Sequence, residues 1–249
     1  MLGWIRNKIG YRMYADGYRR MVENGKIPDQ FKSLSRLRQM GYNPGTIFDV
    51  GAYKGEFADM CLSVWPDSKV YAFEGLPDKI GQLRSRYAGN SGVEVVDALV
   101  GKECVDEVEF YADETASSVF YSDEVSTKKK VVRQRMLSLD SFISDKGLKA
   151  PSFLKIDTQG YEFPIILGCE KHIRDVEVLV VETNFLEVYH GSTNASEVIG
   201  HLYDRGFVIY DVCELHRRPL DNALFQADFL FVKKDSPLRE SKLWDVKKS

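Results

Sequence analysis

Thr46-Ile-Phe-Asp-Val-Gly-Ala-Tyr-Lys-Gly55 and the Glu56-Phe-Ala-Asp-Met-Cys-Leu-Ser-Val-Trp65 that follows it decide the fold. The apolar run over 46–50 predicts a short buried strand, because it is uninterrupted and ends at a glycine. In the second stretch the apolar residues recur at helical spacing. The pair therefore predicts a strand, a tight glycine turn and a helix, which is the first unit of an α/β fold.

The same alternation continues along the chain. A polar, helix-like stretch at 78–87 separates two further apolar runs, and the run at 176–181 is almost continuously apolar, as in parallel strands covered on both faces. The last two runs have no helix between them and predict an antiparallel hairpin. The fold class is therefore α/β, with a doubly wound, mostly parallel sheet, and the later strands are expected at 69–73, 92–98, 152–156, 176–181, 207–210 and 229–232.

Three parts are expected in the chain of 249 residues. Residues 1–45 form an N-terminal helical extension, 46–235 the main domain, and 236–249 a polar tail. Within the main domain the alternation of strand and helix patterns is interrupted at about 105–137, which predicts an inserted hairpin and loop.

Composition restricts the partners. The formal net charge of -3 gives no global attraction to nucleic acid. Four scattered cysteines are typical of reduced thiols in a cytoplasmic protein, and no apolar run reaches the roughly 18 residues of a membrane span. Residues 1–20 carry five basic residues against one acid among aromatic and aliphatic side chains. Two interpretations stay open: peripheral contact with an anionic membrane, or packing on this domain or on a second copy in a homo-oligomer.

Ligands of open α/β sheets bind at the carboxyl ends of the strands. The first strand carries Asp49 near its end and leads into a turn with Gly51 and Gly55. A dinucleotide loop would begin with glycine where this chain has Asp49, and a carboxylate there repels a pyrophosphate. The loop suits a ligand with an amine or sulfonium centre, and the alternative is a plain strand-to-helix turn.

Acids follow the next two strands as well. Glu74 ends the second strand, where a carboxylate can accept hydrogen bonds from both ribose hydroxyls. Asp97 and Ala98 end the third strand, where they would read and cover an adenine ring. The alternative for both acids is an ordinary loop carboxylate. Together with Asp49 they predict an adenosine site without a diphosphate, which favours S-adenosylmethionine over NAD.

Seven motifs recur at strand ends and turns over roughly residues 46–232: Ile47–Gly55, Ala72–Pro77, Ala116–Ser118, Ser138–Phe142, Leu154–Glu162, Val180–Asn184 and Gly206–Phe207. With these motifs the sequence resembles the FkbM-type methyltransferases, which commonly have a valine and an acid at Thr158 and Gln159. The resemblance implies a Rossmann-like class I methyltransferase sheet of seven strands with the last strand antiparallel. It also implies S-adenosylmethionine-dependent methyl transfer to a hydroxyl, often of a sugar, a glycolipid precursor or a natural product, so that the partner is a small-molecule or glycan acceptor.

Asp157, Glu182 and Asn184 end the fourth and fifth core strands, across the expected pocket from the adenosine. Asp157 and Glu182 are the catalytic candidates, with Asp157 as general base. Alternatively, the three side chains supply oxygen ligands to Mg²⁺, which would lower the pKa of a bound hydroxyl. A third possibility is structural: Lys155, in an otherwise buried strand, needs a partner, and Asp157 or Glu182 would serve.

The remaining candidates belong to the acceptor side, and Lys155 is counted among them as well. Ser117 and Ser118 fall in the insertion, His190 follows the fifth strand, and His216 lies between the last two strands. Asp140 is expected to cap a helix. Two rival functions remain open: an NAD(P)-linked oxidoreductase on a similar sheet, and a non-catalytic adapter that binds S-adenosylmethionine.

Overall fold

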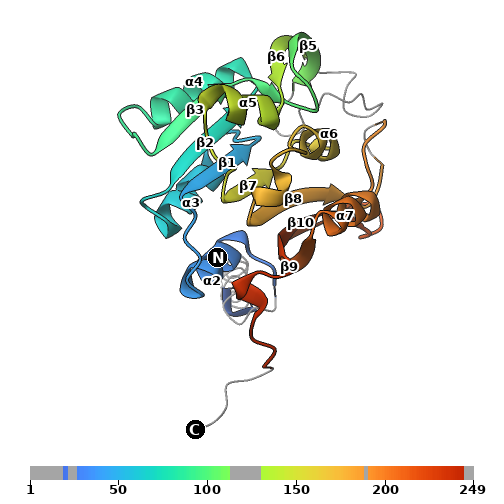
Figure 1. Ribbon diagram of the computed structural model, residues 1–249. Coiled ribbons are helices and arrows are strands. Elements are labelled where there is room, and N and C mark those ends of the chain that lie inside the picture. Colours follow the sequence, from blue (N-terminus) through green and yellow to red (C-terminus); the bar gives the residue numbers. More distant parts are fainter. Residues whose placement is uncertain (1–18, 22–26, 113–129, 188–189, 244–249) are drawn as a thin grey trace, which may run out of the picture.

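The computed structural model describes residues 19–21, 27–112, 130–187 and 190–243, and its centre is a seven-stranded sheet (Figure 1). The strand order is β3-β2-β1-β7-β8-β10-β9. The first five strands are parallel, and β10 runs antiparallel to both β8 and β9. The predicted sheet, with its last strand antiparallel, is confirmed. The strands are β1 (Thr46–Val50), β2 (Lys69–Glu74), β3 (Val93–Asp97), β7 (Phe153–Ile156), β8 (Val178–Asn184), β9 (Phe207–Arg217) and β10 (Leu224–Lys233).

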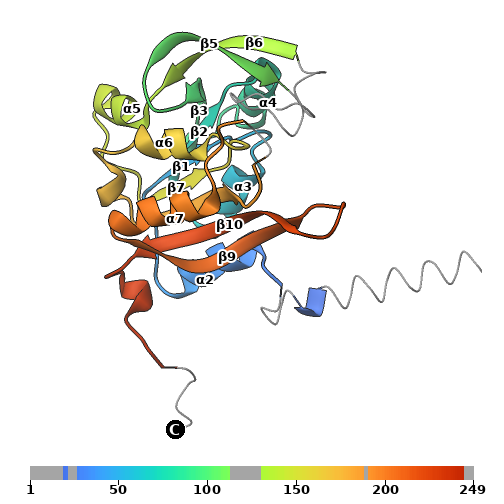
Figure 2. The ribbon, with the colours of Figure 1, turned by 90° about the vertical axis from the view of Figure 1, so that its right-hand side faces the viewer.

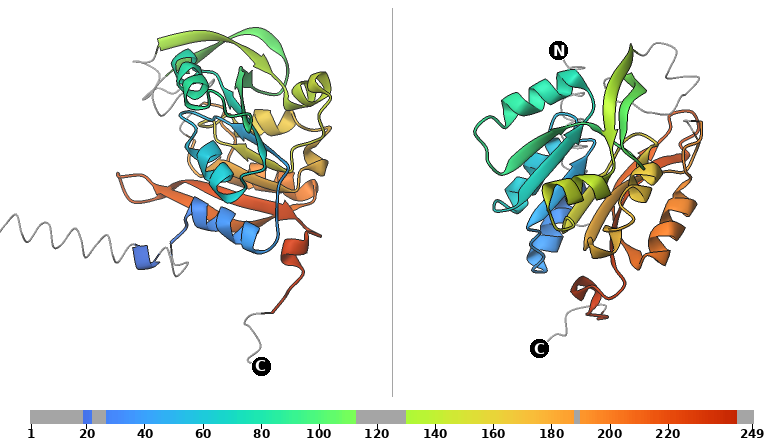
Figure 3. Two further views of the ribbon diagram at one scale, coloured as in Figure 1. Left: turned by 90° about the vertical axis from the view of Figure 1, so that its left-hand side faces the viewer. Right: turned by 45° about the horizontal axis from the view of Figure 1, so that its top comes forward.

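Helices cover both faces of this sheet (Figure 3). Because side chains alternate along a strand, Ile47 and Val70 face one layer of helices, while Phe48 and Tyr71 face the other. Each face is continuously apolar in the strands, which explains the uninterrupted runs in the sequence. One layer contains α2 (Gln30–Gln39), α3 (Glu56–Val64) and α4 (Pro77–Arg86), and the other contains α5 (Leu139–Lys146), α6 (Glu162–Leu167) and α7 (Ala195–Asp204). Two short 3-10 helices are also present, η2 (Ile173–Asp175) and η3 (Pro237–Arg239).

A second, smaller sheet lies at one end of the molecule (Figure 3). It consists of β4 (Leu99–Val100), β5 (Val105–Ala112) and β6 (Lys130–Leu137) in the order β4-β6-β5. The insertion predicted from the sequence therefore forms a hairpin that pairs with β4. Its Gln134 Nε2 donates to Asp97 Oδ1 over 2.8 Å, and its Arg135 Nε donates to the Asp97 carbonyl over 2.9 Å. These bonds hold the small sheet against the end of β3.

Helix α5 is capped by a different residue from the one expected. Ser138 is its N-cap and accepts a hydrogen bond from the Ser141 N–H over 3.1 Å. The expectation that Asp140 caps this helix is wrong, because Asp140 already lies in the first turn. Its carboxylate accepts the Lys171 N–H over 3.1 Å and lies 2.8 Å from His172 Nδ1. Asp140 thus joins α5 to the segment after α6.

The long β9–β10 hairpin packs against α2, the helix nearest the N-terminus that has full described bounds (Figure 2). Ser33 donates to Asp211 over 2.7 Å, and Arg36 forms an ion pair with the same carboxylate at 3.2 Å. Gln30, at the start of α2, reaches Asp228 of β10. Residues of the predicted N-terminal extension therefore approach the carboxyl edge of the sheet.

All four cysteines are free thiols, and three of them are buried. Within the described ranges, no helix combines the length and the apolar character that crossing a membrane requires. Residues 1–18, which hold most of the basic amphipathic segment, lie outside the described residues. Membrane or oligomer contact through residues 1–20 stays a prediction.

Phe48 is the centre of the core layer beneath α5. It is fully buried, and its ring centroid lies 5.3 Å from Tyr71, 5.2 Å from Phe73 and 5.7 Å from Phe142. Phe48→Ala should lower the free energy of unfolding by about 3–5 kcal/mol, from lost burial and the cavity left behind. Urea unfolding measures it. Phe31→Ala, at a side chain 45% exposed on α2, is the control and should cost less than about 1 kcal/mol. Equal losses in both variants would contradict this assignment of the core.

Candidate functional site

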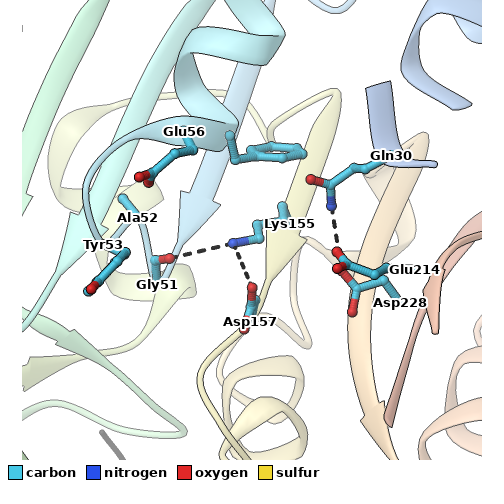
Figure 4. A pocket seen from close by; sticks show the side chains of 10 residues that line it. Gln30, Gly51, Ala52, Tyr53, Glu56, Lys155, Asp157, Glu214 and Asp228 are labelled. Atoms are coloured by element: carbon cyan, nitrogen blue, oxygen red, sulfur yellow. Dashed lines mark hydrogen bonds and ion pairs between the residues drawn. The ribbon is translucent and has the colours of Figure 1, made fainter. Parts of the chain in front are cut away.

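A pocket of about 180 Å³ opens at the carboxyl ends of β1 and β7. Two walls face each other across it (Figure 4). The loop wall comes from the β1–α3 turn, and the hairpin wall from α2 and the β9–β10 hairpin, with Lys155 and Asp157 between them. The loop wall consists of Gly51, Ala52, Tyr53 and Glu56, and the hairpin wall of Gln30, Glu214 and Asp228, while Phe57 completes the lining.

Lys155 joins the two central strands. It lies directly beside Asp49 in the β1–β7 register and is 5% exposed. Its Nζ lies 3.1 Å from Asp157 Oδ2 and 3.6 Å from Asp49 Oδ1, and donates to the Gly51 carbonyl over 3.5 Å. Burial alone would lower the pKa of this ammonium, but the carboxylates of Asp157 and Asp49 outweigh it and raise the pKa. Lys155 therefore stays charged and holds both strand ends together.

Asp49 faces Lys155 rather than the pocket. Its side chain has no exposed surface, and neither carboxylate oxygen accepts a hydrogen bond from any described residue. Burial raises its pKa, and the nearby ammonium opposes that rise. The predicted contact between Asp49 and a cofactor stays a prediction, since the structure shows this side chain only as the partner of Lys155.

The glycines of the turn have a packing cause. Gly51 has φ +81°, and a Cβ on it would overlap the backbone carbonyl of Asp157. Gly55 has φ +91°, and a Cβ there would overlap the hydroxyl of Tyr87, which donates to the Gly55 carbonyl over 2.8 Å. Only glycine adopts a left-handed φ without strain and also has no Cβ atom to overlap these neighbours. This close packing sets the path of the loop wall.

Two residues other than glycine hold left-handed backbones beside the pocket: Tyr53 with φ 49° and Gln159 with φ 56°. Such conformations cost on the order of 1 kcal/mol each and persist where their surroundings enforce them, often at functional sites. Two ammonium groups lie close to the Tyr53 ring, with Lys54 Nζ at 4.7 Å and Lys79 Nζ at 4.8 Å from its centroid. Cation–π contacts thus hold the strained residue in place.

The residues predicted to hold an adenosine lie at neighbouring strand ends. The Glu74 carboxylate accepts hydrogen bonds from the N–H groups of Tyr53, Gly75 and Leu76 over 2.7–2.8 Å. Burial raises the pKa of Glu74, and these hydrogen bonds oppose that rise. Asp97 pairs with Arg84 at 3.1 Å as well as with Gln134. Ala98 is buried and donates its N–H to the Glu74 carbonyl over 3.1 Å. Their cofactor roles stay predictions.

Besides Asp49 and Glu74, three further buried carboxylates lie at this edge of the sheet: Glu162, Glu182 and Asp228. Glu162 Oε1 accepts the N–H groups of Thr158 and Gly160, so this residue closes the loop after β7. Glu182 accepts from the Gln159 and Gln226 amides. Burial is the main cause that raises the pKa of Glu162 to about 7, that of Asp228 to about 7 and that of Glu182 well above its usual range.

The structure does not support the predicted Mg²⁺ site. No group of three or more His, Cys, Asp or Glu side chains in the described segments could hold a metal ion. Asp157 is engaged by Lys155, and Glu182 by two amides. The Asn184 Oδ1 atom accepts from Gln226 Nε2 over 3.0 Å.

The predicted acceptor residues are only partly brought together. Lys155 lines the pocket, and His216 on β9 lies 3.3 Å from the carboxylate of Glu214 in the hairpin wall. His190 is exposed in the loop after β8. Ser117 and Ser118 lie outside the described residues. Roles in acceptor binding stay predictions for all five.

Sequence reasoning missed the hairpin wall and Glu56. Asp228 is 4% exposed and interrupts an otherwise apolar strand, Ala227-Asp-Phe-Leu-Phe-Val232. An acid inside such a run was the available signal, because a buried carboxylate needs a reason. Gln30 carried no comparable signal, since it reaches the pocket from a polar helix far away in the sequence.

The sheet is Rossmann-like, with seven strands and a pocket at the carboxyl ends of its central parallel strands. The sequence model of the methyltransferase FkbM domain matches residues 49–209, well over half of the chain. The protein belongs to the FkbM methyltransferase family.

Individual relatives are more distant. The 31-O-demethyl-FK506 methyltransferase FkbM of Streptomyces tacrolimicus is 24% identical over 196 residues, which cover 67% of this chain and 74% of that protein. Among solved structures, methyltransferase FkbM from Methylobacillus flagellatus KT is similar with 17% identity and a TM-score of 0.49, and the match covers 74% of this chain and 43% of that one. Magnesium protoporphyrin IX methyltransferase from Synechocystis PCC 6803, solved with bound SAM, is similar with 11% identity and a TM-score of 0.46 over 81% and 76% of the two chains.

Gly51→Ala tests the packing of the turn. The variant should lose roughly 2–5 kcal/mol of unfolding free energy, because left-handed strain and a clash with the Asp157 carbonyl add together. Gly147→Ala is the matched control: this glycine is also left-handed, with φ +62°, but has open space around it. It should lose only about 1–2 kcal/mol in the same urea titration. A Gly51 variant no worse than the control would show that the turn can relax.

Glu162→Gln tests the buried acid. Since its folded pKa of about 7 lies above the unfolded value, the folded state keeps a proton that the unfolded state releases, and wild-type stability falls as pH rises between about 4.5 and 7. Glutamine keeps the Oε1 acceptor and does not titrate. In urea titrations across this window, the unfolding free energy of the variant should therefore rise relative to that of wild type by about 1 kcal/mol per pH unit. Glu109→Gln, at a side chain 60% exposed, is the control for the same exchange at the surface. A difference in unfolding free energy between Glu162→Gln and wild type that does not change with pH would refute the assignment.

Proposed function

We propose that the protein is an S-adenosylmethionine-dependent O-methyltransferase that acts on a hydroxyl of a sugar, a glycolipid precursor or a natural product. The observation that carries this proposal is the pocket at the carboxyl ends of β1 and β7 in a chain of the FkbM methyltransferase family. S-adenosylmethionine, when bound, supplies an electrophilic methyl group on a sulfonium centre.

The charge of the pocket supports this choice of cofactor. Its lining contains four carboxylates and one ammonium, and that ammonium is already paired with Asp157 and Asp49. An excess of negative charge attracts a ligand with a sulfonium and an amine and repels one with a diphosphate. The same argument weighs against NAD(P) as the natural ligand.

The strand ends offer groups that suit the rest of the cofactor. Glu74 is a buried carboxylate whose two oxygens have about four acceptor positions, of which three are used by backbone N–H groups. A ribose hydroxyl can use the remaining capacity. Asp97 lies at the adjacent strand end, where an exocyclic amine of an adenine would find an acceptor. Gly51 brings backbone close to the pocket without a side chain.

On the acceptor side, Asp157 lies between the two walls and is held by Lys155 (Figure 4). Fixed carboxylates at this place can orient a hydroxyl by hydrogen bonding. Positioning of the acceptor oxygen in line with the transferred group is the main source of rate in such a reaction.

Calorimetric titration tests the cofactor. Wild-type protein should bind S-adenosylhomocysteine and show no binding of NAD⁺ or NADP⁺. Glu74→Gln should weaken that binding by about 10- to 100-fold, because a hydrogen bond to a charged group contributes about 1.5–3 kcal/mol. Glu94→Gln, on the neighbouring strand and paired with Lys146 at the surface, is the control and should bind as wild type does.

Each rival has its own outcome. Binding of a nicotinamide cofactor alone would replace the proposal with an oxidoreductase. Binding of S-adenosylhomocysteine without methyl transfer to any tested sugar or natural-product hydroxyl, together with unchanged cellular function of Asp157→Ala, would favour the non-catalytic adapter. Transfer of radiolabelled methyl to such an acceptor supports the enzyme.

A further inference from the structure

Asp228 occupies an unusual place in the hairpin wall. It lies on β10 directly opposite Glu182 of β8 and Glu214 of β9 in the sheet register. Like charges directly opposite one another destabilise a sheet, so a row of three acids needs a reason other than stability. Of these three acids, Glu182 is buried outside the pocket lining, and Glu214 lines the pocket. Asp228, between them, is both buried and part of the lining.

Three other carboxylates of this region, Glu162, Glu182 and Asp157, have closer partners than Asp228 has. Glu162 is held by backbone N–H groups, and Glu182 by two side-chain amides, and neither lines the pocket. Asp157 lines it but is tied to the Lys155 ammonium at 3.1 Å. For Asp228, the hydrogen bond from Gln30 Nε2 is long, at 3.5 Å.

The two walls divide the pocket by chemistry. The loop wall belongs to the glycine turn, which we have assigned to the cofactor, and Asp228 faces it from the hairpin wall across Lys155 and Asp157 (Figure 4). A molecule between the walls therefore has the loop on one side and the carboxylate of Asp228 on the other. This arrangement suits a general base, which must come within hydrogen-bond reach of the hydroxyl proton while the hydroxyl oxygen faces the methyl group.

We propose that Asp228 is the catalytic base of this methyltransferase and takes the proton of the acceptor hydroxyl, an inference that rests on the proposed function. The proton moves from the hydroxyl to a carboxylate oxygen of Asp228. The freed electron pair of the hydroxyl oxygen forms the new bond to the methyl carbon, while the carbon–sulfur bond breaks and its pair stays on sulfur. Gln30 positions the carboxylate, and Asp157 stays paired with Lys155.

Charged and titratable groups from every neighbouring element act on Asp228. They are Lys155 and Asp157 at the end of β7, Glu162 on α6, Glu182 on β8, and Cys213 and Glu214 on β9, while α2 presents the neutral Gln30. Burial and the negative charge of Asp157 raise the pKa of Asp228 to about 7, against the effect of Lys155. A base with a pKa near the working pH is effective, because it is ionised in much of the protein and still holds a proton well.

The first experiment uses the full chain without ligand. Protein labelled with ¹³C at the aspartate carboxyl carbons is titrated by NMR from pH 5 to 9. One resonance should titrate with a midpoint near 7 and be missing from Asp228→Asn. No aspartate titrating in this range, or the same resonance persisting in the variant, overturns the proposal.

The second experiment measures turnover with radiolabelled S-adenosylmethionine and methyl β-D-glucopyranoside as probe acceptor. Asp228→Asn should lower kcat by about 10²- to 10⁴-fold and remove the acidic limb of the pH–rate profile, with an unchanged Kd for S-adenosylhomocysteine. Asp211→Asn is the matched control: the same exchange on the same hairpin, at a carboxylate that also contacts α2 but lies outside the pocket lining. It should keep both kcat and the limb.

The outcomes separate the two proposals. Wild-type activity that survives in Asp228→Asn, or an acidic limb that disappears only in Glu182→Gln, refutes Asp228 as the base and leaves the O-methyltransferase standing. Wild-type protein that neither binds S-adenosylhomocysteine nor transfers methyl refutes the proposed function itself. If kcat falls as far in the Asp211→Asn control as in Asp228→Asn, the loss comes from disturbed packing of the hairpin, and the assignment of Asp228 as the base is overturned.

Discussion

The buried ion pair between Lys155 and its two carboxylates is the constraint on which the site depends. A charge this deeply buried is tolerated only with partners, and removing one partner of a buried pair typically costs about 3–5 kcal/mol. Because Asp49 and Lys155 are direct neighbours in the central β1–β7 pairing, the ion pair fixes the two strand ends. It also holds the Gly51 carbonyl, so the turn approaches β7 so closely that only glycine fits. The pocket exists because these ends are held this way.

The acids beyond this ion pair follow a different logic. Glu162, Glu182 and Asp228 are buried within one small region, and one lysine cannot neutralise them together with Asp49 and Asp157. Some of them therefore hold protons at neutral pH, which relieves their mutual repulsion. A region of this kind contributes less to stability than an apolar core would. However, it attracts a cationic ligand and keeps the pKa values of its carboxylates near neutral pH. The apolar layers on both faces of the sheet provide the stability that such a site requires.

Much of this could be predicted from the sequence. Continuous apolar runs identify parallel strands covered on both faces, and their alternation with helical patterns determines the sheet. Residues at the carboxyl ends of parallel strands meet at one edge, so the order of the strands alone is enough to group Asp49, Lys155 and Asp157. Local capping was harder. Ser138 and Asp140 both suit an N-cap, and packing of Asp140 against the segment around His172 decides between them.

The hairpin wall could not be predicted by the same rule, for a geometric reason. In an antiparallel strand, the residues that reach the carboxyl edge of the parallel neighbours do not lie at the strand's own carboxyl end. Asp228 lies in the middle of β10 and meets Glu182 only through the β8–β10 register, while an irregularity between Asp228 and Phe229 shifts its pairing with β9. Register in a hairpin follows from the apolar pattern of both strands and from the turn between them, so it relates residues that lie far apart in the sequence. The hairpin wall is therefore the side of the pocket that sequence motifs describe least.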